Sequence, residues 1–365
     1  MVNENSEIVS QADNKQSGAQ GLPRLATVLV GLAAALLVLV LMSRYASIIG
    51  PILLALNLMV TAYPIHSWLT RRGVPSWMAA CATMFTVYAV LLAMVAGLIW
   101  SVAEMINVLP NYADQWNSLY NQLLNWAGQL GFDSSQLASL LRMVDPNSVI
   151  GAASSVFSGA SGFVGMFVVI VMAVFFMAMD SPGLHGRFKK IRKVRPNAAF
   201  ALNQFATGVR RYWLVTTIFG LIVAVLDGIA LQIMDVPLVM VWVLFSFLTN
   251  YIPNIGFVIG VIPPALVALF ANSWQTSVAV IIAYCVLNFV VQSLIQPRFT
   301  GESVGVTTTV SFLSLLLWSA VLGGLGSLLA LPMTLLVKAL LIDIDPKSRW
   351  VGYIISSKPD SDSSE

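Results

Sequence analysis

The chain has 365 residues, of which 58% are apolar and only 10% are charged, and its formal net charge is +3. This composition excludes a soluble protein built around one core and is typical of a polytopic membrane protein. The small net charge gives no indication of nucleic-acid binding. Residues 1–23 lack the charged-then-apolar pattern of a signal peptide, so we expect a disordered tail followed by a retained membrane helix.

Six apolar runs are near or above the length that crosses a bilayer, for which a helix needs about 20 residues. They lie at 24–42, 45–65, 76–102, 160–179, 212–234 and 274–297. Two longer apolar stretches with glycine and proline near their middles bring the hydrophobic segments to eight. The sequence therefore predicts an all-α polytopic membrane protein.

The two longer stretches, 236–271 and 305–341, hold 36 and 37 residues. One helix of that length would measure about 54 Å, against a hydrocarbon core of about 30 Å. Two full crossings with a turn would need about 40 residues or more. The expected breaks and hinges are Pro253, Gly256, Gly260 and Pro263 in the first stretch, and Gly323, Gly324, Gly326 and Pro332 in the second. Paired interrupted segments of this kind indicate a transporter's binding site.

Each stretch is either a re-entrant hairpin or one long bent span. As hairpins, the first would enter the membrane from outside and the second from inside, so that 212–341 forms a core resembling an inverted repeat. As bent spans, they would place Arg298 outside. We favour the hairpins, because they leave Arg298 on the cytoplasmic side with the other basic residues, whereas the tail 346–365 is cytoplasmic in either case.

Basic residues set the expected orientation in the cell (plasma or inner) membrane. The segment 180–211 is rich in lysine and arginine, whereas 103–159 carries four acidic residues and a single arginine. The positive-inside rule then places 103–159 outside and both termini in the cytoplasm. We expect the basic run to lie beside anionic membrane lipids as a topology anchor.

The segment 103–159 is too polar to span and repeats apolar residues on a helical period, which predicts an amphipathic helix. The repeating residues are Leu109, Tyr112, Trp116, Leu119, Tyr120, Leu123, Leu124 and Trp126. A second short helix is expected to start at Ser134. The small residues between Gly151 and Gly165 suggest close helix packing between copies, so we expect a homo-oligomer.

A few amides lie at membrane depth. Asn250 and Asn254 flank the first break, and Asn288, Gln292 and Gln296 follow one another at four-residue intervals on one face of the sixth span. Amides at this depth can hydrogen-bond an uncharged polar solute, and they can equally join helices to one another. For the helix face that carries Asn288, solute binding and contact between helices both stay open as roles.

Asp227 is the one acidic residue inside a span. An ionisable group at such a position is a candidate proton or sodium site, although Asp227 could also lie near enough to the outer interface to be hydrated. At membrane depth the sequence shows no catalytic constellation and no spacing typical of a metal or cofactor site. We therefore expect neither an enzyme nor a cofactor.

Two strings carry a family resemblance. They are NYIPNIGFVIGVIPPAL at 250–266 and IQPRFTGESVG at 295–305, followed by the glycines and proline of the second stretch. With them the chain resembles the AI-2E transporter family, named for export of the quorum-sensing molecule autoinducer-2, over roughly 25–345. The matching positions are Ile252, Pro253, Gly256 and Pro263, then Gln296, Pro297, Arg298, Gly301 and Gly305, then Gly323, Gly326 and Pro332.

The resemblance implies a secondary transporter that exports a small polar solute, similar to autoinducer-2, by alternating access. Asn250, Asn254, Asn288 and Gln292 would then contact the solute. Gln296, Pro297, Arg298 and Gly301 would anchor the start of the second hairpin. The alternative is a sodium/proton antiporter, since members of the family are also associated with that activity, and Asp227 would then exchange the ions. Asp227 would be the single in-span acid available for this ion exchange, so this alternative ranks lower.

Overall fold

The computed structural model describes residues 24–129, 151, 161–252, 256–296, 306–345 and 351. Every regular element in these ranges is a helix, which confirms the all-α polytopic fold. The chain divides into two units, Met1–Ala46 and Ser47–Glu365. The first unit contains α2, Arg24–Arg44, which covers the first predicted span.

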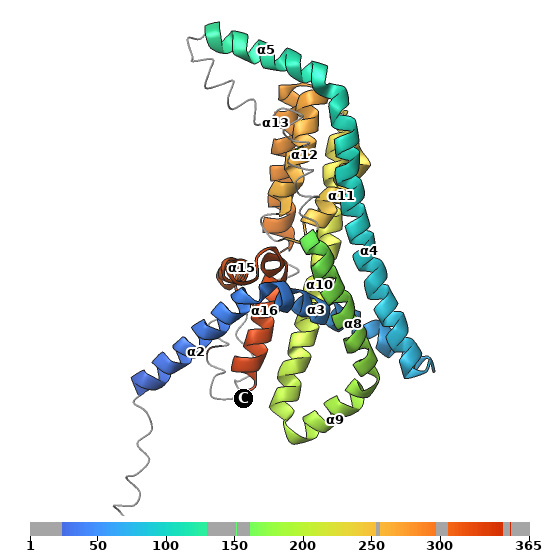
Figure 1. Ribbon diagram of the computed structural model, residues 1–365, viewed down its shortest axis with the longest axis vertical. Coiled ribbons are helices and arrows are strands. Elements are labelled where there is room, and N and C mark those ends of the chain that lie inside the picture. Colours follow the sequence, from blue (N-terminus) through green and yellow to red (C-terminus); the bar gives the residue numbers. More distant parts are fainter. Residues whose placement is uncertain are drawn as a thin grey trace, which may run out of the picture. The chain divides into compact units, whose positions relative to one another are not determined.

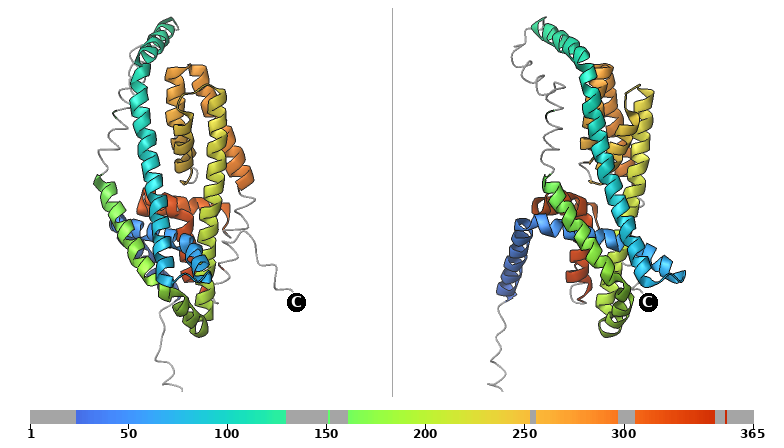
Figure 2. Two further views of the ribbon diagram at one scale, coloured as in Figure 1. Left: turned by 90° about the vertical axis from the view of Figure 1, so that its right-hand side faces the viewer. Right: turned by 45° about the vertical axis from the view of Figure 1, so that its right-hand side comes forward.

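The long helices of the second unit and their connections are shown in Figures 1 and 2. In chain order its elements are α3 (Ala46–Arg71), α4 (Ser76–Val108), η1 (Leu109–Tyr112), α5 (Ala113–Gln129), α8 (Ser161–Asp180), η2 (Ser181–Gly183), α9 (Leu184–Val194), α10 (Pro196–Ile233), α11 (Val239–Thr249), α12 (Gly256–Ala271), α13 (Trp274–Asn288), the π-helix η3 (Phe289–Ile295), α15 (Thr308–Leu322), α16 (Gly324–Lys338) and the π-helix η4 (Ala339–Asp343).

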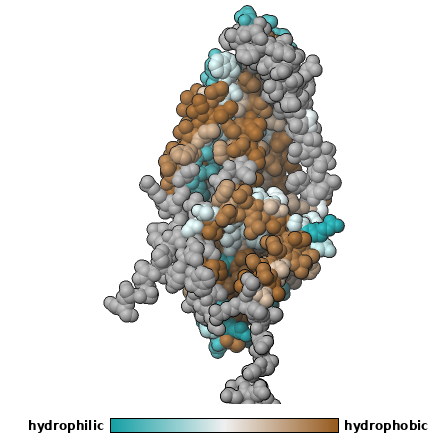
Figure 3. All heavy atoms as spheres, turned by 90° about the vertical axis from the view of Figure 1, so that its left-hand side faces the viewer, coloured by the Kyte–Doolittle hydropathy of each residue, from teal (hydrophilic) through white to brown (hydrophobic). Residues whose placement is uncertain are grey.

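Six helices of the described residues are long and apolar enough to cross a membrane. They are Ala46–Arg71, Ser76–Tyr112, Val164–Val194, Pro196–Ile233, Trp274–Gln292 and Gly324–Asp343. Five of them overlap the predicted spans, and the sixth is the second arm of the second interrupted stretch. Large apolar side chains are exposed along these helices and colour much of the visible surface brown in Figure 3. Such a surface suits contact with lipid.

Helix α10 is longer than its predicted span. The predicted basic segment 180–211 divides at Pro196, because a proline disfavours helical backbone in the residue before it. On one side lies the short basic helix α9, in which no residue is buried. On the other side α10 runs unbroken for 38 residues to Ile233. Small residues on its buried face, such as Gly228, let α11 approach closely.

The first interrupted stretch is a hairpin of two short helices. Helices α11 and α12 have 11 and 16 residues, so their lengths of about 16 Å and about 24 Å fall short of the bilayer core. The two helices fold back on one another: Gly256 packs against the carbonyl of Thr249, and Gly260 packs against Ser246 and Thr249. The break is narrower than the sequence predicts, because Gly260 and Pro263 lie inside α12.

The hairpin is held between α10 and α13. Ser277 of α13 donates a hydrogen bond to the carbonyl of Ala265 at 2.8 Å. At the base of the hairpin, opposite its tip, the Asn272 side chain donates to the carbonyl of Asp235 at 3.2 Å. The buried rings of Trp242, Phe270 and Tyr284 belong to the same apolar core. These contacts fix the position of the hairpin against the long helices.

The second interrupted stretch turns at a single residue, Gly323, whose φ of +64° favours glycine. Gly326 then packs against the carbonyl of Trp318, so that α15 and α16 also form a hairpin. The predicted breakers Gly324, Gly326 and Pro332 lie inside α16, since a proline is tolerated within a membrane helix when neighbours satisfy the freed backbone groups. With η4, this second arm has 20 residues and is long enough to cross a membrane.

The described part of the predicted amphipathic segment 103–159 is helical. Helix α4 continues to Val108 and leads through η1 into α5. Tyr112 and Tyr120 pack against the apolar core that contains α12 and α13. The predicted helix start at Ser134, and most of the stretch from Gly151 to Gly165, lie outside the described residues.

Candidate functional site

The tip of the first hairpin is fixed to α10. Helix α11 ends where the backbone N–H of Asn250 donates to the carbonyl of Ser246 at 3.0 Å. The next residue, Tyr251, places its hydroxyl 3.0 Å from the Thr217 hydroxyl of α10. Its ring centroid lies 5.9 Å from that of Trp213 on the same helix. Since Tyr251 is anchored in this way, the side chain of Asn250 is held in a defined place.

Three predicted site residues meet at this tip: Asn250 from α11, Asn288 from α13 and Gln292 from η3. We call them the amide cluster. The Gln292 side chain donates to the Asn288 side-chain oxygen at 2.8 Å and to the Asn250 side-chain oxygen at 3.3 Å. The Asn288 amide donates in turn to the carbonyl of Tyr284 at 2.8 Å. The cluster therefore joins residues that are 42 positions apart.

One donor in the amide cluster is unused. Among the described residues, the buried Nδ2 group of Asn250 has no hydrogen-bond partner. Asn250 is only 8% exposed. A buried amide that lacks a partner costs about 1–3 kcal/mol, so native proteins rarely leave one without a purpose. Gly220 of α10 lies beside this residue, since a Cβ there would meet the Asn250 Cβ at 3.6 Å. The cluster thus contains a buried N–H group for which the described residues supply no acceptor.

The amide cluster lies deep along α10. Gly220 comes 13 residues before Ile233, where α10 ends, which places it about 20 Å from that end of the helix. This position lies inside the span 212–234 that the sequence predicts. Residue Gln292 also belongs to a π-helix, a distortion that occurs often at functional sites.

A second polar cluster consists of Asp227, Ser246 and Tyr284, which we call the carboxyl cluster. The Ser246 hydroxyl donates to Oδ2 of Asp227 at 2.7 Å. In the part of the chain that the structure describes, the other carboxyl oxygen, Oδ1, and the hydroxyl of Tyr284 have no hydrogen-bond partner. Asp227 and Tyr284 are both 0% exposed, and the tyrosine lies within electrostatic range of the carboxyl. Asp227 is therefore enclosed by protein rather than exposed at an interface.

The two clusters lie one helical turn apart on the same helices. On α11, Ser246 precedes Asn250 by four residues, and on α13, Tyr284 precedes Asn288 by four. Sequence analysis did not single out Ser246 or Tyr284. The signal that could have found them is this spacing, because each lies one turn before an amide that the sequence did single out.

The remaining predicted site residues are not all part of these clusters. Gln296 caps the end of η3, where its backbone N–H donates to the carbonyl of Val291. The other predicted residues lie outside the described residues: Asn254, Pro253, Pro297, Arg298 and Gly301. Their predicted roles stay predictions.

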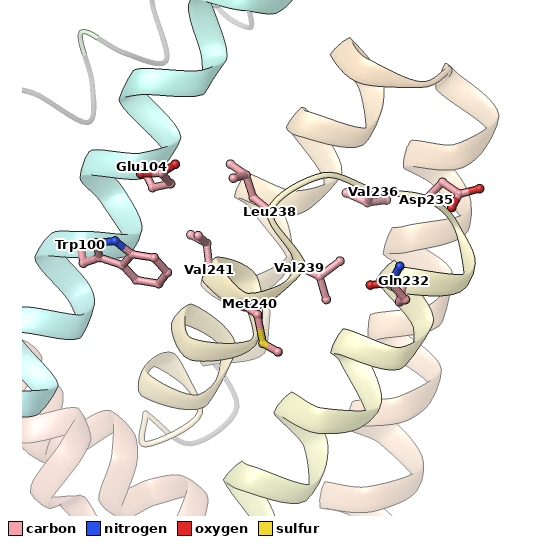
Figure 4. Close-up of a pocket in the computed structure, with 9 residues that line it drawn as sticks. All are labelled: Trp100, Glu104, Gln232, Asp235, Val236, Leu238, Val239, Met240 and Val241. Atoms are coloured by element: carbon pink, nitrogen blue, oxygen red, sulfur yellow. The ribbon is translucent and has the colours of Figure 1, made fainter.

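An open pocket of about 480 Å³ lies between α4 and the connection from α10 to α11. Figure 4 shows Trp100 and Glu104 of α4 on one side and the turn between the two helices on the other. Asp235 and Leu238 in this turn have φ values of 53° and 64°, so the connection is tight. None of the lining residues belongs to the amide or carboxyl cluster.

A family model described as AI-2E family transporter matches residues 25–345. The chain belongs to the AI-2E transporter family. It is 29% identical to the "AI-2 transport protein TqsA" of Escherichia coli (strain K12), over 80% of this chain and 85% of that protein. It is 31% identical to a "Putative transport protein" of Haemophilus influenzae, over 85% and 90% of the two chains. The "Putative transport protein YhhT" of Escherichia coli (strain K12) is 30% identical over 85% and 89%.

Membership of the AI-2E family makes transport the general function of this chain. The family comprises transport proteins rather than enzymes. The apolar helices agree with that membership, and the chain is a multi-pass membrane protein.

Proposed function

We propose that this AI-2E family protein exports a small, uncharged polar solute similar to autoinducer-2, and that the amide cluster binds it. The observation that carries the proposal is the unpartnered Nδ2 group of Asn250, buried beside two further amides at the tip of a broken helix. Amides both donate and accept hydrogen bonds, which suits a solute with hydroxyl or carbonyl groups. The printed name of TqsA, an AI-2 transport protein, supports this class of solute.

The broken helices support alternating access. A break leaves backbone groups that only protein or a wet cavity can satisfy, so it is tolerated where a solute passes. In this proposal the tips of the two hairpins act as hinges on either side of the solute, and 212–341 works as a core with two related halves. Export needs the protein in the cell membrane with both termini in the cytoplasm, as the distribution of basic residues suggests. The basic helix α9 would then lie against anionic lipids, and copies of the chain would associate.

The proposal is tested by flux of labelled autoinducer-2 from proteoliposomes that hold the purified protein and an imposed pH gradient. The test variant is Gln292→Met, which keeps the volume of the side chain and removes both of its hydrogen bonds to the cluster. We expect efflux to fall at least about tenfold, the effect of losing about 1.4 kcal/mol of binding. The matched control is Gln122→Met, at an exposed position on α5.

Wild-type efflux that Gln122→Met preserves and Gln292→Met abolishes would support the proposal. Equal efflux from both variants would show that the amide cluster is not the solute site. Protein-free vesicles set the baseline, because a small solute also leaks through lipid.

A second candidate function is cation/proton antiport. The observation that favours it is Asp227, a carboxyl enclosed at membrane depth with one oxygen unpartnered. Its test is proton movement in the same vesicles on addition of sodium, without autoinducer-2. Sodium-triggered proton release that Asp227→Asn abolishes would favour this function over solute export.

A further inference from the structure

The environment of Asp227 does not suit a permanent negative charge. The side chain is 0% exposed, and the ion pairs of the described residues do not involve it. A carboxylate at membrane depth without a cation is costly, so such a group takes up a proton or pairs with a positive charge. The carboxyl therefore needs a partner that the surrounding helices do not supply.

Each helix packed around the carboxyl contributes one neighbour. Helix α11 contributes the Ser246 hydroxyl, which donates to Oδ2 at 2.7 Å. Helix α13 contributes the Tyr284 hydroxyl, the titratable group within electrostatic range. Gly260 of α12 lies behind Ser246, since a Cβ there would meet the Ser246 hydroxyl oxygen at 3.8 Å. Helices α11 and α13 pack against α10, which carries Asp227. The faces turned toward Asp227 thus offer hydroxyl groups and a glycine.

We propose that Asp227 binds a proton that is coupled to transport of the solute, and that Ser246 and Tyr284 complete the proton site. This inference rests on the proposed export function. The proton binds Oδ1, while Oδ2 keeps its hydrogen bond from Ser246. When the proton leaves for the other side of the membrane, the Tyr284 hydroxyl donates to the freed Oδ1 and stabilises the carboxylate. No bond other than O–H forms or breaks.

The size of the site favours a proton over a metal cation. The carboxyl cluster presents a carboxyl and two hydroxyls, whereas a hard cation such as Ca²⁺ takes six to eight oxygen ligands. Space is also limited, because a Cβ at Gly260 would lie only 2.9 Å from the Thr249 hydroxyl oxygen. A proton needs no coordination shell and binds the carboxyl without further ligands.

The link to the solute site runs through two helices. Ser246 accepts the backbone N–H of Asn250 on its carbonyl, and Tyr284 accepts the Asn288 side chain on its carbonyl. A change at the carboxyl that moves Ser246 or Tyr284 therefore also moves a member of the amide cluster. Proton-driven export requires coupling between the two sites, and a contiguous network of this kind can carry it.

The first test measures the proton site without any solute. Infrared difference spectra of the purified protein in lipid are recorded as pH is raised, for the wild type, Asp227→Asn and the control Asp235→Asn, whose side chain is exposed at the end of α10. We expect the C=O band of a protonated carboxyl that disappears on raising pH, is absent in Asp227→Asn and persists in Asp235→Asn. Ser246→Ala should shift the frequency of the band and keep its intensity, because it removes the hydrogen bond to that carboxyl.

Absence of any band that depends on Asp227 would overturn the inference, as would a band removed by sodium at constant pH. If Asp227→Asn does not fold, the frequency shift in Ser246→Ala decides, and an unchanged band in that variant overturns the assignment. The second test is efflux of labelled autoinducer-2, which should depend on the pH gradient in the wild type and lose that dependence in Asp227→Asn. A band without any efflux would refute the proposed solute and leave the proton site standing. Efflux without the band would refute the proton site and leave the proposed solute standing.

Discussion

The two interrupted stretches fold into hairpins of different kinds. The first has two arms too short to span a membrane and a break of several residues at its tip, whereas the second turns at Gly323 alone and has one arm of full length. Their sequences suggest equivalent segments, because both stretches have similar lengths and contain several glycines and prolines. The structure instead gives the two hairpins arms of different lengths.

The polar groups of the two hairpins differ in the same way. In the second, Thr334 donates to Ser314 at 2.7 Å and lies 3.1 Å from the Trp318 indole nitrogen, which donates to it. In the first, Asn250 keeps an unused N–H group next to its partner Gln292. Hydrogen bonds satisfied within the protein join helices, whereas unsatisfied donors at membrane depth are available to a ligand. We therefore propose that the first hairpin binds the solute and that the second stabilises the fold.

The largest effect is expected from the glycines on which both hairpins depend. A Cβ at Gly256 would overlap the Thr249 carbonyl, and a Cβ at Gly326 would overlap the Trp318 carbonyl. Gly256→Ala and Gly326→Ala should each destabilise the protein by about 4 kcal/mol or more, since backbone must move. Thermal unfolding in detergent measures this. Gly324→Ala is the control, because nothing lies within 4 Å of a Cβ there, and equal melting of the three variants would contradict the hairpin packing.

The second largest effect is expected at Asn250 in the first hairpin, where one substitution separates solute binding from stability. Asn250→Ala removes the unused donor and the acceptor of Gln292. It should lower efflux of labelled autoinducer-2 at least about tenfold, with a loss of stability of about 1 kcal/mol. Efflux assays paired with thermal unfolding test this. A loss of efflux that merely follows a large loss of folded protein would argue against a binding role.

At the second hairpin we expect a loss of stability without a loss of efflux. Thr334→Val removes the hydroxyl that joins Ser314 and Trp318 and should cost about 1–2 kcal/mol of stability. Efflux per folded molecule should stay at the wild-type level. Thr86→Val provides the matched control, because the exposed Thr86 hydroxyl bonds only within its own helix, to the carbonyl of Ala82. Efflux that falls with Thr334→Val would place a binding role in the second hairpin as well.

The smallest effect is expected at the anchor of the first tip. Tyr251→Phe removes the hydrogen bond to Thr217 and keeps the ring contact with Trp213. Its stability cost should be about 0.5–1 kcal/mol, and efflux should fall a few-fold because Asn250 is held less firmly. The same substitution at Tyr45, whose side chain is exposed, is the control. An unchanged efflux would show that the tip keeps its position without this bond.

Sequence patterns predict much of the candidate site. The four-residue spacing of Asn288 and Gln292 places both on one helix face, and the breakers around Asn250 predict a helix end at membrane depth. The structure adds that these two places meet. That contact joins residues far apart in the chain, and no local pattern encodes which helix faces which.

The differences between prediction and structure also have physical causes. Gly260, Pro263 and Pro332 were expected to break helices. The structure places them inside helices, because a helix packed on its neighbours tolerates glycine and proline. The sequence does not predict which arm of the second stretch is long enough to cross a membrane, since continuation of α16 into η4 depends on packing against α10. The sequence pattern does not single out Ser246, because serine is common within apolar helices. Only the structure shows that a carboxyl lies beside it.

The central claim is that the amide cluster of the first hairpin binds the solute. The most direct measurement is equilibrium binding of labelled autoinducer-2 to three purified proteins: the wild type, Gln292→Met and Thr334→Val. We predict that Gln292→Met weakens binding at least about tenfold, whereas Thr334→Val binds as the wild type does. Equal binding by all three proteins, or binding weakened only by Thr334→Val, would contradict the account.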